Sequence, residues 1–319
     1  MADRGSLPVI VAVDGSVDSE RALRWAGEAA RLRSAALQVV HVWPYVTAVR
    51  VADDDGSGDP VLDELRAQPL AWSLPQVEFR SLSGLPDTQL PALGAEAQLL
   101  VLGSRGRGGF ASLLLGSNGL ACAAQSACPV VVVPRPDRDG TGRDEESEDG
   151  EDGEDGEALP PAVLQVTLGV DATCEEPGAI GFALAEASRR GARLKIVSGY
   201  SWPMLMPPDF AYVPAVYETT QQQYEDALGS RLADALAPHR ARYPEVGVQV
   251  ELRNADAAGQ LVEASRASDL VVVARRRRRL PIGRRLGSVA HAVLLHALCP
   301  IAVVPEDPEG PASPERPAA

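Results

Sequence analysis

Short runs of β-branched and apolar residues alternate along the chain with longer stretches in which apolar residues recur at helical spacing. Runs such as VIVAV (9–13) and VVVV (130–133) have the length and composition of buried strands. The stretch DSERALRWAGEAARLRS (18–34) spaces its Ala and Leu residues as an amphipathic helix does. Strands that alternate with helices predict a parallel sheet with both faces covered.

The pattern occurs twice, because the second half of the chain repeats the first. Segments VIVAVDGS (9–16) and LQVVHVW (37–43) return 157 positions later as VTLGVDAT and LKIVSGY. Segments LLVLGS (99–104) and ACPVVVVP (127–134) return 171 positions later as LVVVAR and LCPIAVVP. We therefore expect five strands in each copy.

The rise in the offset places an insertion between the second and third strands of the second copy. There the first copy has a short helical segment, DPVLDELRAQPLAW (59–72), whereas the second has a long one at 217–243. The long segment predicts a longer helix in the second copy.

Charge and composition separate two globular domains from two segments that cannot form a core. Residues 135–161 contain 12 acidic and 3 basic residues, and 10 of the acids lie within 144–157. Such a run repels itself and buries too little apolar surface to order, as does the Pro-rich end at 306–319. The predicted organisation is a domain at 1–134, an acidic disordered linker at 135–161, a domain at 162–305 and a disordered tail at 306–319.

Several functional classes are disfavoured by composition. The formal charge of −14 opposes nucleic-acid binding by the chain as a whole, and no apolar run approaches the ~20 residues of a membrane span, so we expect a cytoplasmic protein. The four cysteines lack metal-ligand spacing and are expected to be buried thiols, and the four histidines show no pattern for a metal or a triad. Lys195 is the only lysine, so the first copy has no Walker lysine.

Candidate chemistry is concentrated in VLGSRGRGGFASLLLGSNG (101–119), a Gly-rich loop between a strand and a helix. Gly103 and Gly106 are followed after nine residues by Gly116 and Ser117. Glycine after a strand lets the backbone approach a ligand, and a helix start offers free amides and a positive dipole end to an anion. The loop therefore indicates polyphosphate binding, although Gly-rich turns of this kind also occur without a ligand.

An acidic residue completes the candidate site. Asp14 ends the first strand run, and in open α/β sheets ligands bind at the carboxyl ends of strands where the strand order reverses. If the first and fourth strands flank that reversal, Asp14 and Gly103 face one crevice that a mononucleotide spans, with Asp14 suited to a ribose or adenine donor. We expect Mg²⁺ to shield the phosphates, supplemented by Arg105 or Arg107.

These residues resemble the universal stress protein family: VIVAVDGS, the HVW at 41–43, the GxxG loop with nine residues before GS, and the closing ACPVVVVP. The resemblance covers nearly all of both copies and implies two tandem flavodoxin-like domains, each an α/β fold with a five-stranded parallel sheet ordered 3-2-1-4-5. Likeness to the family's ATP-binding branch implies that phosphate is held by Gly103, Gly106, Gly116 and Ser117, and adenosine by Asp14 and Val42.

The second copy departs from this pattern. It keeps Asp171, Gly287 and Ser288, but Ala274 and Arg277 replace the first two glycines and Gly199 replaces Val42. A Cβ and a guanidinium at those positions are expected to keep backbone and phosphate apart, so the second copy is predicted to have lost ordinary ATP binding.

The favoured function is an ATP-binding stress-response regulator or sensor rather than a dedicated enzyme, because no general base can be named near the phosphate loop. Two alternatives remain: a scaffold that binds no nucleotide, and a weak ATPase or adenylating enzyme, since VDGSVDSERA (13–22) weakly resembles the loop of ATP pyrophosphatases. The sequence identifies no protein target.

Two further features of the sequence are candidate interaction sites. Arg275–Arg279 with Arg284 and Arg285 form a solvated basic loop, a docking point for the acidic linker or, least favoured, a nucleic-acid patch. The last strand of each copy is a sheet edge, and apolar edges are usually covered. We therefore expect the last strands to pair, either within one chain or between two chains as a homodimer.

Overall fold

The computed structural model describes residues 7–43, 55, 57–67, 76–106, 116–135, 163–173, 176–201, 214–276 and 286–305, with the backbone alone for 214–220. The predicted alternation of strands and helices is confirmed. The first half contains β1 (Val9–Ala12), α1 (Val17–Arg33), β2 (Leu37–Trp43), α2 (Pro60–Ala67), β3 (Val77–Ser83), α3 (Pro86–Ala92), a 3₁₀ turn (Leu93–Ala95), β4 (Leu99–Gly103), α4 (Ser117–Gln125) and β5 (Val130–Val133). The second half contains β6 (Gln165–Gly169), α5 (Pro177–Arg190), β7 (Arg193–Tyr200), α6 (Pro214–Arg240), β8 (Val248–Asn254), α7 (Ala257–Ala264), a 3₁₀ turn (Ser265–Ala267), β9 (Leu270–Arg275), α8 (Ser288–His296) and β10 (Ile301–Pro305).

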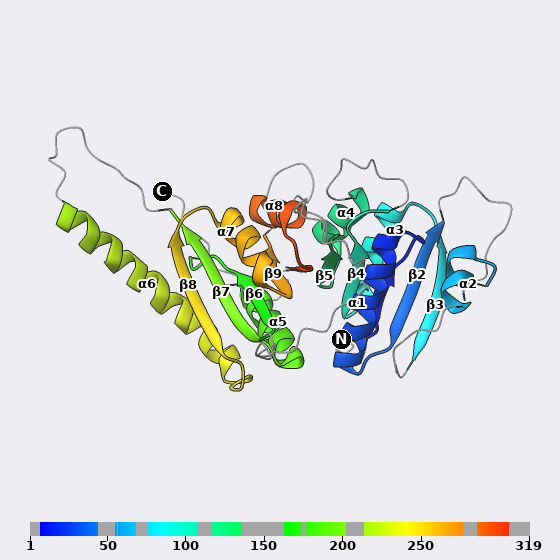
Figure 1. Cartoon of the computed structure of the whole chain (residues 1–319), viewed down its shortest axis with the longest axis horizontal. Coiled ribbons are helices and arrows are strands. Elements are labelled where there is room, and N and C mark those ends of the chain that lie inside the picture. The colour runs from blue at the N-terminus through cyan, green and yellow to red at the C-terminus, as the bar shows by residue number, and fades with distance from the viewer. Residues whose placement is uncertain are drawn as a thin grey trace, which may run out of the picture.

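All ten strands join in one sheet, ordered β3-β2-β1-β4-β5-β10-β9-β6-β7-β8. Within each half the neighbouring strands are parallel, and the order is third, second, first, fourth, fifth in both halves. The halves meet where β5 pairs antiparallel with β10, which confirms the expected pairing of the last strands within the chain. Figure 1 shows the two halves side by side, with α2 beside β3 at one end and α6 beside β8 at the other.

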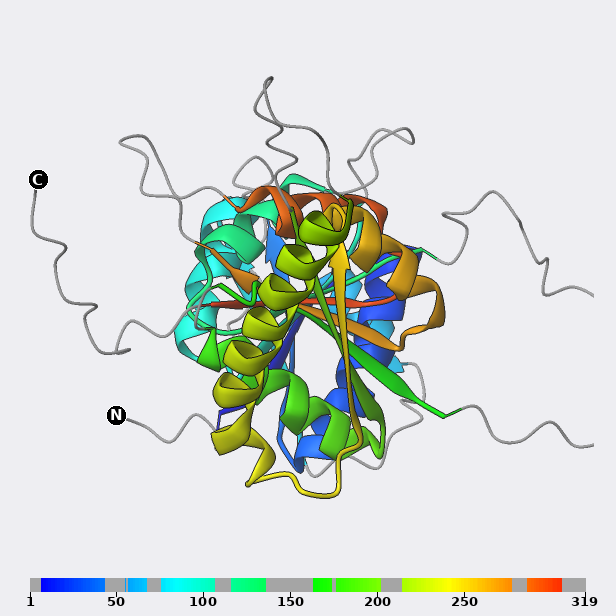
Figure 2. The same cartoon turned by 90° about the vertical axis from the view of Figure 1, so that its left-hand side faces the viewer.

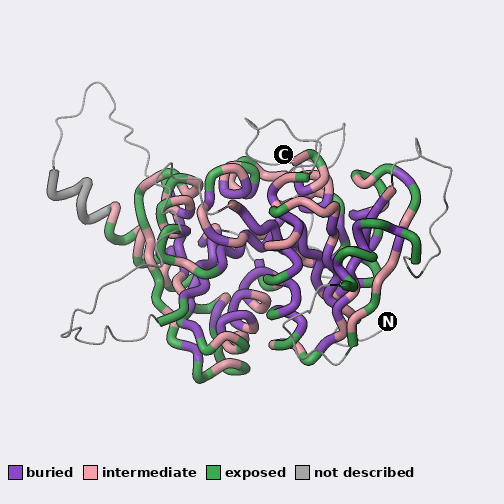
Figure 3. Tube along the Cα trace, turned by 45° about the vertical axis from the view of Figure 1, so that its right-hand side comes forward, coloured by how far each residue is buried: buried purple, intermediate pink, exposed green. Residues whose placement is uncertain are grey.

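The sheet is the middle of three layers. Helices α1, α2, α5 and α6 pack on one face, and α3, α4, α7 and α8 on the other. Because both faces are covered, the inner strands are mostly apolar, and all four residues of β5 are buried valines. Figure 3 shows burial concentrated along these strands, with exposed residues on the outer turns and helix faces.

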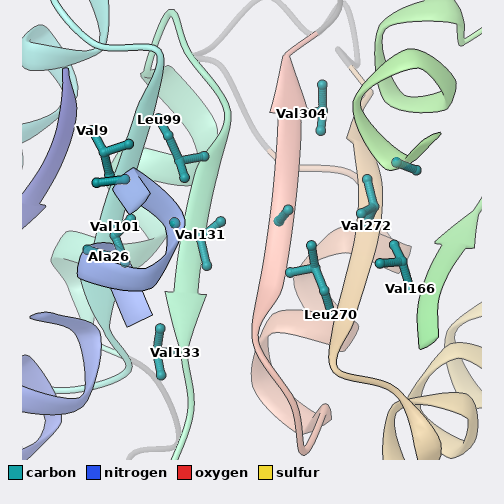
Figure 4. Close-up of a cluster of buried hydrophobic side chains, with 14 of the residues drawn as sticks. Val9, Ala26, Leu99, Val101, Val131, Val133, Val166, Leu270, Val272 and Val304 are labelled. Carbon is teal, nitrogen blue, oxygen red and sulfur yellow. The ribbon is translucent and has the colours of Figure 1, made fainter. Parts of the chain in front are cut away.

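The core runs without interruption through the junction of the halves. Alternate residues of β5 and β10 point to opposite faces, so Val131 and Val133 share one apolar cluster with Ala302 and Val304. Figure 4 shows Val131 and Val304 on the two adjoining strands, flanked by valines and leucines of their own halves. The hydrophobic contribution to stability is therefore shared between the halves rather than enclosed in two separate cores.

The predicted difference in helix length is also confirmed. Helix α2 has 8 residues, whereas α6 in the corresponding position has 27. Seen end-on in Figure 2, α6 runs diagonally in front of β8. Its buried Leu232 and Leu236 extend the core over the outer strands of the second half.

Three of the four cysteines follow the sequence prediction. Cys122, Cys128 and Cys299 are buried thiols that form no disulfide, and burial raises the pKa of Cys299 to about 12. Cys174, residues 136–161 of the predicted linker 135–161, and the predicted tail 306–319 lie outside the described residues. Arg135, placed by the sequence in the linker, is described and pairs with Asp18.

The ends of α1 and α5 provide a test of backbone strain. Both helices end in a left-handed residue, which is Ser34 (φ 51°) after α1 and Gly191 (φ 60°) after α5. Glycine adopts this conformation without the Cβ penalty, so we expect Ser34→Gly to raise the free energy of unfolding by about 0.5–1 kcal/mol. The matched Gly191→Ser should lower it by a similar amount. Urea unfolding of both variants measures the difference, and a stabilising Gly191→Ser would contradict the explanation.

Candidate functional site

A crevice, here called the first crevice, opens at the carboxyl ends of β1, β2 and β4, and its volume is about 100 Å³. The structure brings six of the seven predicted site residues to it: Asp14, Val42, Gly103, Arg105, Gly106 and Gly116. The seventh, Ser117, is the exposed first residue of α4, directly after Gly116, and is not among the residues that line the crevice.

The turn from β1 to α1 orients the carboxylate of Asp14. Gly15 adopts φ 72°, which turns the chain sharply after the strand. Ser16 then caps α1, because its Oγ accepts a hydrogen bond from the amide of Ser19 (3.2 Å). Oδ1 of Asp14 accepts two hydrogen bonds from Ser16, from the amide (3.1 Å) and from Oγ (2.6 Å). The carboxylate is therefore anchored by one oxygen at the rim of the crevice.

The two glycines of the GxxG pattern have different surroundings. A Cβ on Gly103 would lie 2.6 Å from the carbonyl oxygen of Asp18 in the first turn of α1, so glycine is needed there for packing of the helix on β4. A Cβ on Gly106 would lie 2.5 Å from Oδ2 of Asp14. Glycine at position 103 is thus required by helix packing, which the sequence did not indicate. Gly106 instead lies against the carboxylate of Asp14, the candidate ligand-binding group.

The start of α4 faces this crevice with its amides uncapped. Gly116 donates a hydrogen bond to the carbonyl of Ser104 (2.8 Å), which fixes the entry into the helix. Gly116 is the N-cap and has no side chain to bond the first-turn amides. Together with the helix dipole, these amides form a site that favours an anion, and Arg105 lies beside it.

Buried Asp18 ties α1 to the strands behind the crevice. Its side chain is 1% exposed, and Oδ1 accepts hydrogen bonds from Arg21 (2.8 Å) and Arg135 (2.7 Å). Ser104 donates to Oδ2 (3.3 Å). Asp18 therefore holds the first turn of α1 to β4 and to the end of β5. Its position in the amphipathic helix gave no signal for this contact, because all its partners except Arg21 are distant in sequence.

His41 has a partner that the sequence analysis did not find. Its Nδ1 donates to Oδ2 of the fully buried Asp59 (2.7 Å), which also accepts from Trp43 (2.7 Å) and Ser81 (2.9 Å). Oδ1 of Asp59 accepts from the first amides of α2. Burial raises the pKa of Asp59, but the hydrogen bonds and charge from His41 outweigh it and lower the pKa below its usual value. Asp59 before Pro60 is a helix-start signal in the sequence, but its contact with His41 is tertiary.

The second half has a wider crevice at the equivalent position, here called the second crevice, of about 340 Å³. Helix α1 begins at Val17, but α5 begins at Pro177, three residues after the position that matches Val17. Helix α5 therefore starts later relative to the repeat than α1 does, and Ala274 lines the second crevice. The predicted obstruction of a phosphate by Ala274 stays a prediction, and Arg277 lies outside the described residues.

Arg276 fills part of the second crevice. Its Nη2 lies 2.7 Å from Asp171, the counterpart of Asp14, and its Nε lies 2.8 Å from the buried Glu176. Burial raises the pKa of Asp171, but hydrogen bonds from Thr173 and Arg276 outweigh it and lower the pKa. Arg275, 6% exposed, donates to the carbonyl of Ser126 (2.5 Å). These two arginines therefore do not belong to the loosely solvated patch that the sequence suggested.

Two negative findings apply to the part of the chain that the structure describes. No group of three or more His, Cys, Asp or Glu side chains is arranged to hold a metal ion. No helix combines the length and the apolar character that crossing a bilayer requires.

The fold and the crevices define an α/β protein of flavodoxin-like architecture built from two related halves. The sequence profile of the universal stress protein family matches residues 7–134 and 164–305, and the chain belongs to that family. A universal stress protein of Mycobacterium tuberculosis is 30% identical over 310 residues, which cover 92% of this chain and 96% of that protein.

Two solved structures extend the comparison. A universal stress protein from Archaeoglobus fulgidus matches with a TM-score of 0.59 at 15% identity, over 95% of this chain and 99% of that chain, which shows a shared fold. Another from the same organism, in complex with dAMP, covers 45% of this chain and 98% of that one at 16% identity, with a TM-score of 0.29.

The packing of Gly103 generates a stability prediction. Gly103→Ala drives a Cβ into the backbone of Asp18 and should lower the free energy of unfolding by about 1–3 kcal/mol. Gly116→Ala is the matched control, because its nearest contact would be at 3.6 Å and its φ of −76° suits any residue. Denaturant unfolding without nucleotide measures both; equal effects of the two variants would contradict a packing requirement at Gly103.

The carboxylate of Asp59 generates a pH prediction. Its pKa in the folded state lies below the unfolded value, so its stabilising contribution is fully present above about pH 4 and is lost as the pH falls through the folded pKa. Asp59→Asn should destabilise the protein at pH 7 and flatten the fall in stability below about pH 4. Thermal unfolding of both proteins across this range provides the measurement, with Asp63→Asn, an exposed pair with Arg66 in the same helix, as control. Parallel pH profiles for wild type and Asp59→Asn would contradict the assignment.

Proposed function

We propose that the first crevice binds ATP with Mg²⁺ and that the chain is a nucleotide-dependent regulatory protein. The observation that carries this proposal is the meeting of Asp14, the segment Gly103–Gly106 and the uncapped start of α4 at one crevice. Membership of the universal stress protein family supports it, because this loop resembles that of the ATP-binding branch.

Each group of residues has a distinct task in this proposal. Asp14 and Val42 hold the adenosine part. The backbone at Gly103, Gly106 and Gly116, with Ser117, receives the phosphates at the positive end of α4. Arg105 adds charge beside them, and Mg²⁺ shields the remaining phosphate charge.

Binding requires the first crevice to widen. A volume of about 100 Å³ is below the ~300–1,000 Å³ of typical small-molecule sites. The contact that closes it is between Gly106 and Asp14, the two ends of the proposed nucleotide site. ATP therefore separates these residues on binding, and this separation provides a local change that a protein partner can detect.

The second crevice is not proposed to bind ATP, although it is wider. The guanidinium of Arg276 already neutralises Asp171 and Glu176, so an adenosine hydroxyl or amine would have to displace a partly buried ion pair. Gly199 also replaces Val42, and the chain at Ala255–Ala257 approaches it within 3 Å of a Cβ position. We therefore expect one ATP per chain.

Calorimetry with Mg-ATP on the full chain tests the proposal. Wild type should bind one equivalent, and Gly106→Val should weaken binding by about tenfold or more, because its side chain collides with the carboxylate of Asp14. Gly247→Val is the matched control, since nothing lies within 4 Å of a Cβ there. Thermal unfolding without nucleotide verifies that both variants are folded.

The alternatives give different results in the same samples. If wild type binds no ATP, the proposal is wrong and a scaffold function remains. Two equivalents per chain would contradict the assignment of the second crevice. Phosphate release measured in parallel distinguishes a regulator from an ATPase: turnover that disappears in Gly106→Val assigns hydrolysis to the first crevice.

A further inference from the structure

The joint between the halves, formed by β5 and β10, has local two-fold symmetry. Val131 lies opposite Ala302, which is also its counterpart in the repeat, 171 positions later. Val130 lies opposite Val303, which is the counterpart of Val132 in the repeat. Val132 lies opposite Ile301, which is the counterpart of Val130. The backbone of this joint would therefore serve equally for two first halves, for two second halves or for one of each. Side chains beside the strands must decide which pairing forms.

One carboxylate beside the joint contacts three arginines. Glu186 in α5 is fully buried and forms ion pairs with Arg33 of α1, whose side chain is 4% exposed, and with Arg190 of its own helix. Arg189 also contacts it (2.7 Å). The charges of these arginines outweigh the effect of burial and lower the pKa of Glu186, so it is ionised at neutral pH.

The repeat shows that this contact is one-sided. Arg33 and Arg190 are counterparts at the offset of 157, but the counterpart of Glu186 is Ala29. A symmetric joint would contain two such ion pairs, whereas here a single acid lies among the arginines of both halves. Arg190 in turn lies over the ring of Trp25 in α1, 5.3 Å from its centroid, a cation–π contact across the joint.

The opposite face of the sheet has a second one-sided contact. Arg275 of β9 crosses the joint to the carbonyl of Ser126, which ends α4. The counterpart of Arg275 is Ser104, whose shorter side chain bonds Asp18 in its own half. On each face of the joint, a residue of the second half thus makes a polar contact to the first half. The counterpart of that residue in the first half, Ala29 or Ser104, does not make the equivalent contact to the second half.

We propose that Glu186 selects the partner of the first half, so that this surface accepts a second half and rejects another first half. In a joint of two first halves, Arg33 would face its own copy with Ala29 in place of the acid. Two buried guanidinium groups would then lack the buried carboxylate that Arg33 has in the native joint, which is strongly unfavourable. A joint of two second halves would keep its acids, so the discrimination acts on the first half.

A cysteine on the symmetry axis reports which halves pair. The thiol introduced by Val131→Cys would lie opposite the same thiol of a second chain only in a joint of two first halves, at a separation that a disulfide can bridge. Under mild oxidation the full-length Val131→Cys protein should give no covalent dimer on a non-reducing gel. Val131→Cys with Ala302→Cys is the positive control and should lose free thiol, because those positions are paired in the native joint.

Two added substitutions should remove the selection from opposite sides. Glu186→Ala withdraws the acid from the native joint, and Ala29→Glu supplies one to a joint of two first halves. Each, combined with Val131→Cys, should raise the cross-linked fraction by about tenfold. Glu263→Ala is the control and should leave it unchanged, because Glu263 is an exposed residue of α7 that pairs with Arg266 on the opposite face of the sheet.

Circular dichroism establishes which variants fold, and cross-linking is compared among those. Cross-linked dimers in the Glu186→Ala or Ala29→Glu background, but not with Val131→Cys alone, support the proposal. Equal cross-linking with Val131→Cys alone overturns it, as does the absence of cross-linking in every folded variant while the positive control closes. Ala29→Glu is the second variant in case Glu186→Ala does not fold, since it removes none of the native carboxylates.

Discussion

The antiparallel pairing of β5 with β10 is the constraint on which the rest of the structure depends. Both strands are apolar on both faces, so an unpaired edge at either would expose backbone groups and valine side chains together. Their pairing merges two five-stranded sheets into one and makes the core continuous across the joint. It also brings α1 against α5, which places Arg33 within reach of Glu186.

The two crevices differ because their first helices begin at different points. In the first half, the opening turn of α1 packs on β4, requires glycine at 103 and leaves a small crevice beside Asp14. In the second half the helix starts later relative to the repeat, the crevice is wider, and Arg276 and its two carboxylate partners lie in it. A change of one helical turn thus alters the volume and the charge of the site while the sheet stays the same.

The sequence predicted the features that repeat and follow a local pattern. The strands and the long α6 follow from the spacing of apolar residues, and the two halves follow from the internal repeat. The pairing of the last strands follows from the need to cover apolar sheet edges. The contacts it missed join residues that are distant in sequence. His41 meets Asp59 across 18 residues, and Gly103 meets Asp18 across 85, so neither contact has a local pattern. The Asp14 crevice was predictable because parallel strands bring their carboxyl ends to one edge.

The repeat explains how the halves can have different tasks without a loss of stability. A two-fold joint requires two similar surfaces, but it places no such requirement on the crevices at the far ends of the strands. The second crevice differs from the first: Asp171 pairs with Arg276, and the adjacent Arg275 reaches across to the end of α4. Since α4 begins at the first crevice and ends at this contact, its two ends are held by different halves. The second half therefore supports the helix that presents the proposed phosphate site, and the two halves form one structural unit.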